Sequence, residues 1–322
     1  IKVSVDEQKD GKYTMSLLNF KMNDFMQIGN IVIKDVEATK CSNVIMLNAA
    51  RDIQITKGDD ENVEWMGPGL GNVNILLKGE LKGDNFNAYL NIPLAGNMIV
   101  GVKLGKNCNE MGQLPNAGFE NFHEASYSNA KSQEPNGWHS FMSSTGSMAS
   151  MVSAAVHTYA SSEVRENAAE DNKQCVKIVS TPVKVGSIVA ASANGTITTG
   201  RLKAGSMTAS SKDNCSFLDF SATAVDANGD PFYAVLNNKP DAMKVWVKFK
   251  AGDGNKNPKA TISALLTNGN MVQDPEDDKY AANIIARANN SSIESKDEWQ
   301  EITIPFTYDN AEEMPKAALV TM

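Results

Sequence analysis

The sequence lacks two features that would each indicate a particular kind of partner, namely a long hydrophobic run and an excess of basic residues. Its apolar runs, such as Val44 to Leu47, are no longer than a β-strand, whereas a membrane-spanning helix needs about 18 or more apolar residues. Lys and Arg total 30 against 38 Asp and Glu, which gives a net charge of −8. Nucleic-acid binding requires clustered positive charge to neutralise phosphates. The sequence therefore predicts no transmembrane helix and no nucleic-acid partner.

Cysteine and histidine are scarce, which limits the metal and redox chemistry available to the chain. The sequence contains four cysteines and three histidines, namely Cys41, Cys108, Cys175, Cys215, His123, His139 and His157. No two cysteines form a CxxC pair, and three histidines give little support to a histidine-based site, so we expect no zinc centre. The thiols are interpreted as free and buried or, because their number is even, as one disulfide in each domain. In an oxidising compartment we expect Cys175 and Cys215 to pair.

Motifs of well-known catalytic machineries are also lacking. The sequence contains no GxSxG, no HExxH, no Walker loop and no GxGxxG, patterns that mark several large enzyme classes. A glycoside hydrolase needs two carboxylates about 5 to 10 Å apart. Acidic candidates beyond residue 113 include Glu120, Glu124, Asp219, Asp241 and Glu301. Because no spacing singles out a pair among them, catalysis is the alternative and not the expectation.

The first hundred residues alternate between apolar and polar side chains in short pieces. Tyr13, Met15 and Leu17 fall on one face of a predicted strand, and such period-two patterning is typical of half-buried strands. Dipeptides suited to tight hairpins separate the pieces. They are Asp10-Gly11, Gly29-Asn30, Gly58-Asp59, Gly83-Asp84 and Gly96-Asn97. We therefore expect an antiparallel sheet, curled toward a barrel, over residues 1–106.

A polar stretch without any hydrophobic pattern separates two blocks of β patterning. Residues 107–113 form this stretch, which we interpret as a linker. Beyond it, β patterning returns in about ten segments without a long helix, and one of these strands is predicted at residues 217–225. Such a series favours a β-sandwich or jelly roll over residues 114–322. The sequence thus predicts an all-β protein of two domains.

Three segments of the first domain carry a family resemblance. They are Asp10-Gly-Lys-Tyr-Thr-Met-Ser-Leu-Leu-Asn-Phe20, Ile28-Gly-Asn-Ile-Val-Ile-Lys-Asp-Val36 and Leu76-Leu-Lys-Gly-Glu-Leu-Lys-Gly-Asp84. Together they resemble the calycin-like domains of secreted gut-bacterial proteins. The resemblance implies a barrel that holds a small apolar ligand or, alternatively, one that is filled by its own side chains and serves as a spacer.

The second domain resembles a different family. Asn116-Ala-Gly-Phe-Glu120 and Gly137-Trp138 are similar to the opening of galactose-binding-like jelly rolls. The segments Ala193 to Gly200, Asn238 to Phe249 and Trp299 to Tyr308 resemble more closely the family named "putative carbohydrate metabolism domain". The resemblance implies a carbohydrate ligand and a structural calcium ion held in part by Glu120. Such jelly rolls usually end on a strand with paired aspartates, which has no counterpart before Met322. No organic cofactor is expected.

Trp246 is the residue that we favour for ligand binding. In the predicted strand around it, Val245 and Val247 lie on one face, whereas Lys244, Trp246 and Lys248 lie on the other. An exposed aromatic ring offers a flat apolar surface to the C–H face of a sugar. The alternative is that a loop covers Trp246. Trp138 is a further ligand-binding candidate, and packing in the core or at the sheet edge is the alternative for it.

Asp226-Ala-Asn-Gly-Asp230 places oxygen-bearing side chains at the first, third and fifth positions of a calcium loop. However, such a loop needs Gly at its sixth position and Glu at its twelfth, and this chain has Pro231 and Asn237 there. An Asn-Gly hairpin turn between two strands is therefore the interpretation that we favour.

These observations favour a non-catalytic carbohydrate-binding protein, or an accessory to glycan uptake, at the cell surface or in the periplasm. Its partner would be an oligosaccharide or polysaccharide. A glycoside hydrolase using two carboxylates of the second domain is the alternative, and a structural or adhesive surface protein is a third class. The chain begins at Ile1 and not at Met, which fits removal of a signal peptide or a lipoprotein leader, with a possible N-terminal lipid anchor, or a trimmed chain.

Overall fold

The chain is all-β, as the sequence predicts, and it forms two compact units, Ile1–Met111 and Gly112–Met322. The computed structural model describes residues 1–23, 26–41, 44–93, 99–106, 114–168, 170, 172–185, 188–221, 223–236, 238–254 and 258–322. The predicted linker at 107–113, which contains Cys108, and the predicted turn at Gly96-Asn97 lie outside these residues. Each unit is described by itself below.

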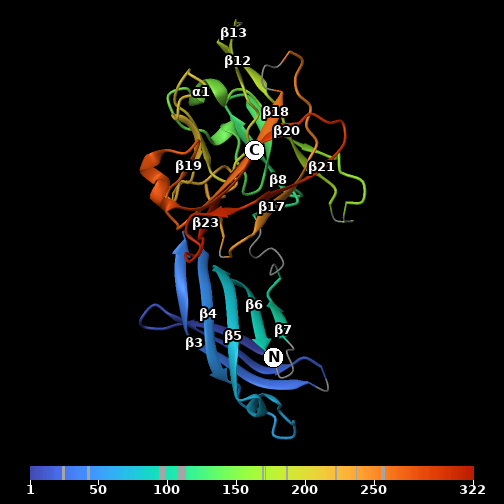
Figure 1. Ribbon diagram of the computed structural model, residues 1–322, viewed down its shortest axis with the longest axis vertical. Coiled ribbons are helices and arrows are strands. Elements are labelled where there is room, and N and C mark those ends of the chain that lie inside the picture. The colour runs from blue at the N-terminus through green and yellow to red at the C-terminus, as the bar shows by residue number, and fades with distance from the viewer. Residues whose placement is uncertain are drawn as a thin grey trace. The chain divides into compact units, whose positions relative to one another are not determined.

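The first unit is a seven-stranded antiparallel sheet in which every strand pairs with its neighbour in the sequence. The sheet is curled, and its strands run from blue to teal in Figure 1. The strands are β1 (Lys2–Glu7), β2 (Tyr13–Lys21), β3 (Gln27–Cys41), β4 (Val44–Gln54), β5 (Asn72–Lys82), β6 (Asn85–Pro93) and β7 (Ile99–Leu104). A short 3₁₀ helix, η1 (Gly67–Leu70), precedes β5.

The inner face of this sheet is filled by its own side chains. Tyr13, Met15 and Leu17 on β2 are buried, as their alternation predicts. The same alternation buries side chains of β3, β5 and β6. The resulting core contains Ile31, Ile33, Val73, Ile75, Leu77, Ala88, Leu90 and Ile92. A curled sheet of this size can be filled completely by such residues. Of the two alternatives for the barrel interior, the structure therefore supports the side-chain-filled one.

Two of the predicted hairpin turns are confirmed, and one is wrong. Gly11 joins β1 to β2 and Gly83 joins β5 to β6, both with positive φ. Gly29, in contrast, lies inside β3, where the pairing with β2 changes register. Asn30 and Thr56 exchange two backbone hydrogen bonds beside it, and a Cβ on Gly29 would lie 2.2 Å from the Thr56 carbonyl oxygen. The glycine therefore permits a close approach between two backbones and does not form a turn.

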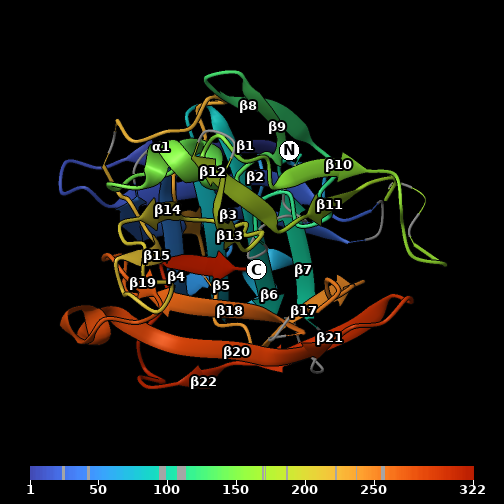
Figure 2. The same cartoon turned by 90° about the horizontal axis from the view of Figure 1, so that it is seen from above.

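The second unit contains one large sheet and several small ones, all antiparallel. The large sheet has the strand order β16-β23-β18-β20-β22, of which Figure 2 labels β18, β20 and β22 side by side. Its strands are β16 (Ala234–Val235), β18 (Lys259–Thr267), β20 (Ile284–Glu294), β22 (Thr307–Tyr308) and β23 (Ala317–Thr321). A three-stranded sheet contains β14 (Arg201–Ala204), β15 (Asn214–Phe217) and β19 (Gln273–Asp274).

Four two-stranded pairs complete the β structure of this unit. They are β8 (Phe122–Tyr127) with β9 (Ala130–Pro135), β10 (Thr158–Ser161) with β11 (Cys175–Ile178), β12 (Thr181–Val185) with β13 (Ile188–Ala193), and β17 (Ala242–Val247) with β21 (Gln300–Pro305). Among the described residues of the unit, the helices are η4 (Phe141–Ser143), α1 (Ala149–Val152) and η5 (Asp278–Asn283). Within the described ranges, every helix is too short or too polar to span a bilayer. The jelly-roll assignment stays a prediction.

Two expectations for the second unit are wrong. The strand predicted at residues 217–225 does not form, because β15 ends at Phe217 and the described residues 218–221 and 223–225 contain only a single bridge, between Val225 and Pro231. Cys175 and Cys215 do not form the expected disulfide. They lie in different sheets, on β11 and β15, and both are free thiols. Burial raises the pKa of each thiol, as is typical of unreactive cysteines.

Candidate functional site

Trp246 lies where the sequence predicts it, on the outer face of the pair β17–β21. The two strands pair over six residues, and Trp246 stands opposite Glu301. Met243 and Ile304 point to the other side and are buried in the core. Trp246 itself is 39% exposed, which is unusual for so large an aromatic side chain. The loop cover that was the alternative for this residue is therefore incomplete.

Charged side chains lie around the Trp246 ring, and each of the two lysines on its face is paired with an acidic residue. The guanidinium of Arg165 lies over the ring, 4.7 Å from its centre. Lys244 pairs with Glu301, and Lys248 pairs with Glu163. Both lysines that the sequence assigns to the binding face thus already have an acidic partner. We therefore expect less preference for acidic glycans than an unpaired lysine face would give.

Trp138, the other aromatic candidate, lies in the core of the second unit. It is 1% exposed, and its indole N–H donates to the carbonyl oxygen of Pro115 at 2.8 Å. The ring of Phe119 packs against it edge-on, with 5.2 Å between ring centres. Since a ring with this burial cannot stack on a ligand, packing is the alternative that the structure supports for Trp138.

Glu120, the predicted calcium ligand, has a different set of neighbours. Its carboxylate accepts hydrogen bonds from the backbone N–H groups of Lys173 at 3.0 Å and Gln174 at 3.3 Å. These donors occupy part of the acceptor capacity of the carboxylate that a calcium ion would use. Among the described residues, the clusters of potential metal ligands do not include Glu120. Calcium binding at this residue stays a prediction with little geometric support.

Trp65 in the first unit borders an open pocket of about 380 Å³. The pocket is lined by Ile1, Asn19, Lys21, Asp59, Asp60 and Trp65. However, Trp65 is only 8% exposed, and the ammonium of Lys21 lies over its ring at 5.4 Å. The ring is thus already covered, and we place the favoured binding face on the second unit.

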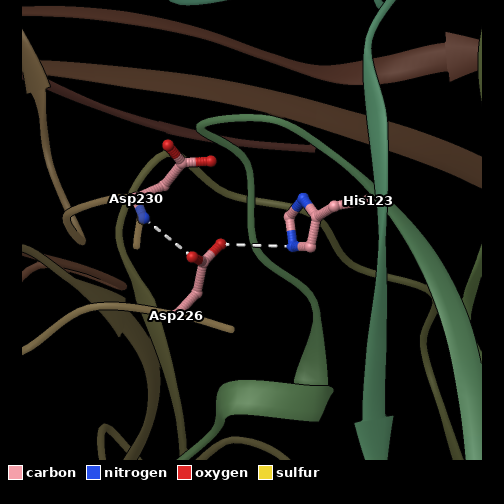
Figure 3. A group of neighbouring side chains, drawn as sticks. All are labelled: His123, Asp226 and Asp230. Carbon is pink, nitrogen blue, oxygen red and sulfur yellow. Dashed lines mark hydrogen bonds and ion pairs between the residues drawn. The ribbon is translucent and has the colours of Figure 1, made fainter. Parts of the chain in front are cut away.

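A buried polar cluster in the second unit escapes the sequence analysis. His123 on β8 and Glu134 on β9 are directly opposite each other in the strand pairing. His139 follows the turn after β9, and its backbone pairs with Thr198. Asp226 comes from the Asp226–Asp230 loop, which forms a tight turn with a hydrogen bond from the Asp226 N–H to the Asp230 carbonyl oxygen, although a single bridge between Val225 and Pro231 flanks it in place of the two expected strands. The turn directs the Asp226 carboxylate to the two imidazoles, and Figure 3 shows it facing His123.

The four side chains of this cluster are close together and largely shielded from water. Asp226 Oδ2 lies 3.3 Å from His123 Nε2 and 3.3 Å from His139 Nδ1. Glu134 Oε2 lies 3.7 Å from His123 Nε2. His139 is 0% exposed and Glu134 is 1% exposed. Two imidazoles and two carboxylates therefore share one buried space.

The charges of the cluster shift the pKa values of its members. Burial lowers the pKa of His123, but the side chains of Asp226, Glu134 and Asn136 outweigh this effect and raise it to about 10. Burial alone would raise the pKa of Asp226, but His123 and His139 outweigh burial and hold it well below its usual range. Opposite charges at short range in a water-poor site have this effect.

No spacing in the sequence could have revealed the cluster, because its members come from four separate segments. The one local signal is the cross-strand position of His123 and Glu134 on two short strands joined by a tight turn. Finding Asp226 requires the fold.

Comparison with known proteins identifies the character of the first unit. Residues 1–104 match the family described as "Calycin-like beta-barrel domain". The first unit is calycin-like. This match covers the seven strands of the curled sheet and agrees with the resemblance seen in the sequence. A comparison with curated proteins finds no significant match.

Several solved structures show a distant overall likeness. One is described as a "putative glycoside hydrolase" from Bacteroides vulgatus ATCC 8482, with 15% identity, a TM-score of 0.39, and coverage of 63% of this chain and 85% of that chain. Another, also described as a "putative glycoside hydrolase", is from Bacteroides thetaiotaomicron VPI-5482, with 12% identity, a TM-score of 0.37, and coverage of 73% and 71%.

A third structure is described as a "putative outer membrane protein" from Bacteroides fragilis NCTC 9343. It has 8% identity and a TM-score of 0.21, with coverage of 99% of this chain and 86% of that chain. Likeness of this degree does not assign a function.

Proposed function

We propose that the protein is a non-catalytic carbohydrate-binding protein and that the outer face of β17–β21, centred on Trp246, is its binding face. One observation supports this most: a large aromatic ring is 39% exposed on a paired strand. Aromatic rings stack on the apolar C–H face of a pyranose, while neighbouring polar groups bond its hydroxyls. Glu301 and Lys244 supply such polar groups beside the ring.

The strand pair holds the platform in place before a ligand arrives. Six consecutive residue pairs fix the register of β17 against β21, and Met243 and Ile304 anchor the pair in the core. A rigid platform reduces the conformational entropy that binding has to overcome. A weak sugar contact can then contribute most of its interaction energy to affinity.

Whether a sugar can displace Arg165 from the Trp246 ring depends on the size of the stacking energy. A Trp side chain offers roughly 250 Å², so an exposed fraction of 39% corresponds to about 100 Å². Burying that area stabilises a complex by about 2.5 kcal/mol. An exposed cation–π contact such as that of Arg165 is worth only about 0.5–1 kcal/mol. Stacking of a sugar therefore outweighs the displacement of the guanidinium.

The wider role that we propose is accessory to glycan uptake, outside the cytoplasm. The calycin-like unit would then serve as a spacer or as a second recognition module, since its interior is filled by side chains. The partner would be an oligosaccharide or polysaccharide. No organic cofactor is required for such a role.

A glycan array tests the proposal, because it samples neutral and acidic glycans with the full-length chain. We expect binding to a restricted set of glycans, and the Trp246→Ala variant should lose that binding. Release of reducing sugar from the bound glycans would identify a glycoside hydrolase instead. A protein that binds no glycan on the array would contradict the proposal and favour a structural or adhesive role.

A further inference from the structure

The buried cluster of His123, Glu134, His139 and Asp226 is independent of the Trp246 face. In three of its members, one polar atom of the side chain is fixed by the surrounding protein while another remains directed into the cluster. His123 Nε2, His139 Nδ1 and Asp226 Oδ2 are all buried and meet one another only as ion-pair contacts of 3.3 Å that lack hydrogen-bond geometry. Buried polar atoms almost always have a partner, so three such atoms facing one space point to a missing one.

The outer contacts of the histidines determine which ring nitrogens are available. His139 Nε2 lies 3.2 Å from the carbonyl oxygen of Pro231. A carbonyl only accepts hydrogen bonds, so Nε2 carries the proton and, in the neutral ring, Nδ1 presents its lone pair to Asp226 Oδ2 at 3.3 Å. His123 Nδ1 is 3.1 Å from Asn136 Oδ1, which leaves Nε2 facing the carboxylates. Metal-binding histidines are oriented by outer contacts of this kind.

The carboxylates are oriented in the same way. Asp226 Oδ1 accepts from the backbone N–H groups of Asn228 at 2.9 Å and Asp230 at 2.8 Å, which leaves Oδ2 for the cluster. Glu134 Oε1 accepts from the Ser140 N–H at 2.7 Å, and its Oε2 faces His123. Asp230 has a supporting position, because its carboxylate accepts from the Gly137 N–H at 2.8 Å.

We propose that this cluster binds one divalent transition-metal ion of the zinc class, with His123 Nε2, His139 Nδ1, Asp226 Oδ2 and a carboxylate oxygen of Glu134 as ligands. Ligand atoms about 2.0 Å from a tetrahedral zinc ion are about 3.3 Å apart. The separation is 3.3 Å for His123 and Asp226, 3.3 Å for His139 and Asp226, and 3.7 Å for His123 and Glu134. The potential ligand atoms of Glu134, His139 and Asp226 all lie within 4.8 Å of one another.

The ligand chemistry favours a transition metal over calcium or magnesium. Imidazole nitrogen suits zinc, copper, iron and nickel, whereas calcium and magnesium require oxygen ligands. A divalent ion also balances the charge of the two buried carboxylates. The ligands are almost completely buried, so the ion has no open position for a substrate, which is typical of structural sites.

The role of the ion is to connect segments that are distant in the sequence. His123 and Glu134 belong to β8 and β9, His139 to the segment before η4, and Asp226 to the 226–230 turn. An ion shared by these four segments stabilises the folded second unit relative to the unfolded chain. The site is therefore structural and is separate from sugar binding.

The test is a titration of the full-length chain with Co²⁺ after treatment with a chelator and its removal. We expect saturable visible absorption at one equivalent of Co²⁺, and its displacement by Zn²⁺. Free Zn²⁺ at about 100 times the Kd should raise the Tm of the second unit by roughly 5 °C or more. The spectrum should contain no thiolate-to-cobalt band, which would reveal binding at Cys175 or Cys215.

Variants separate this site from adventitious binding. His123→Gln changes the least buried ligand and should weaken Co²⁺ binding at least tenfold, and Asp226→Asn should do the same. His157→Gln is the matched control, because His157 is the third histidine of the chain and lies outside the cluster. Circular dichroism of each metal-free variant verifies folding.

Two outcomes would overturn the proposal. The wild-type chain could show no cobalt band at one equivalent, in which case protons alone close the cluster as a network of ion pairs. Alternatively, folded His123→Gln and Asp226→Asn could bind as tightly as the His157→Gln control, which would place the ion elsewhere. Neither outcome affects the sugar-binding proposal, because the titration contains no glycan.

Discussion

Arg165 and Trp246 illustrate how one side chain can cover another without preventing its function. Arg165 is held by its own loop, where its guanidinium donates to the carbonyl oxygen of Asn167 at 2.9 Å. Its position over the indole ring means that a stacked sugar has to displace it. The residue therefore opposes binding.

We predict that Arg165→Ala raises the affinity of the protein for its glycan about two- to fivefold. The reason is that the lost cation–π contact, worth about 0.5–1 kcal/mol, no longer has to be broken. Isothermal titration calorimetry with a glycan found on the array measures this change. A weaker affinity in the variant would show that the guanidinium bonds the sugar and does not compete with it.

Protonation of the His157 ring affects the stability of the folded protein. Its Nδ1 lies 3.0 Å from the carbonyl oxygen of Val179, to which it donates, and its buried Nε2 has no hydrogen-bond partner. Burial lowers the pKa of His157 from 6.5. Below pH 6.5 the unfolded chain therefore binds a proton more readily than the folded protein, and the folded protein loses stability as the pH falls.

We predict that the free energy of unfolding decreases between pH 7.5 and pH 5.5 by more in the wild type than in His157→Gln. A Gln side chain can still donate to the Val179 carbonyl oxygen, but it does not titrate. Urea unfolding at the two pH values measures both decreases, and subtracting one from the other removes the contributions of the remaining groups. Equal decreases in the two proteins would contradict this assignment.

At the scale of single strands, alternation is the most informative signal in the sequence. Met15 and Leu17 are buried because they fall on the core face of the half-buried strand β2, and Trp246 is exposed because β17 obeys the same rule. Alternation fails at residues 217–225, where apolar side chains such as Leu218 are buried from irregular chain and not from a strand. An apolar residue can therefore be buried without belonging to a strand.

Glycine is harder to interpret, since one residue type serves two purposes. Gly83 and Gly29 both have positive φ, but only Gly83 joins two strands. At Gly29 the deciding factor is Thr56 on a remote segment, whose backbone lies alongside. Tertiary contacts of this kind leave no local pattern in a sequence.

We predict that Gly29→Ala destabilises the first unit by about 2 kcal/mol or more, because the new Cβ would collide with the Thr56 carbonyl and the positive φ strains any other residue. Gly69→Ala is the matched control, since a Cβ there has open space and no positive φ. Guanidinium unfolding of both variants gives the difference. Similar stabilities for the two would show that the backbones can move apart without loss.

For the whole molecule, the sequence predicts the class of fold far better than the sites. Period-two patterning extends over both units and specifies an all-β chain, and the calycin-like match agrees with it. The polar cluster could not be predicted, because only three histidines are present and their number says nothing of where the fold places them. Two of them meet two carboxylates in a space formed by four segments.

The central claim is that this two-unit protein binds carbohydrate through the exposed ring of Trp246. Loss of the ring removes about 100 Å² of apolar contact, worth about 1.5–2 kcal/mol after the displacement of Arg165. Because Val245 and Val247 retain the inner face of the strand, the fold should survive the substitution. Tyr280 provides the matched control, since its ring also lies under a cation, Lys279, at 4.7 Å, but on η5 and not on β17.

The most direct measurement is titration calorimetry of wild type, Trp246→Ala and Tyr280→Ala against one array-selected oligosaccharide, with a melting curve for each protein. The account predicts that Trp246→Ala raises the Kd at least tenfold with an unchanged Tm, whereas Tyr280→Ala retains the wild-type Kd. A Trp246→Ala protein that binds as tightly as wild type and melts several degrees lower would make Trp246 a structural residue and contradict the account.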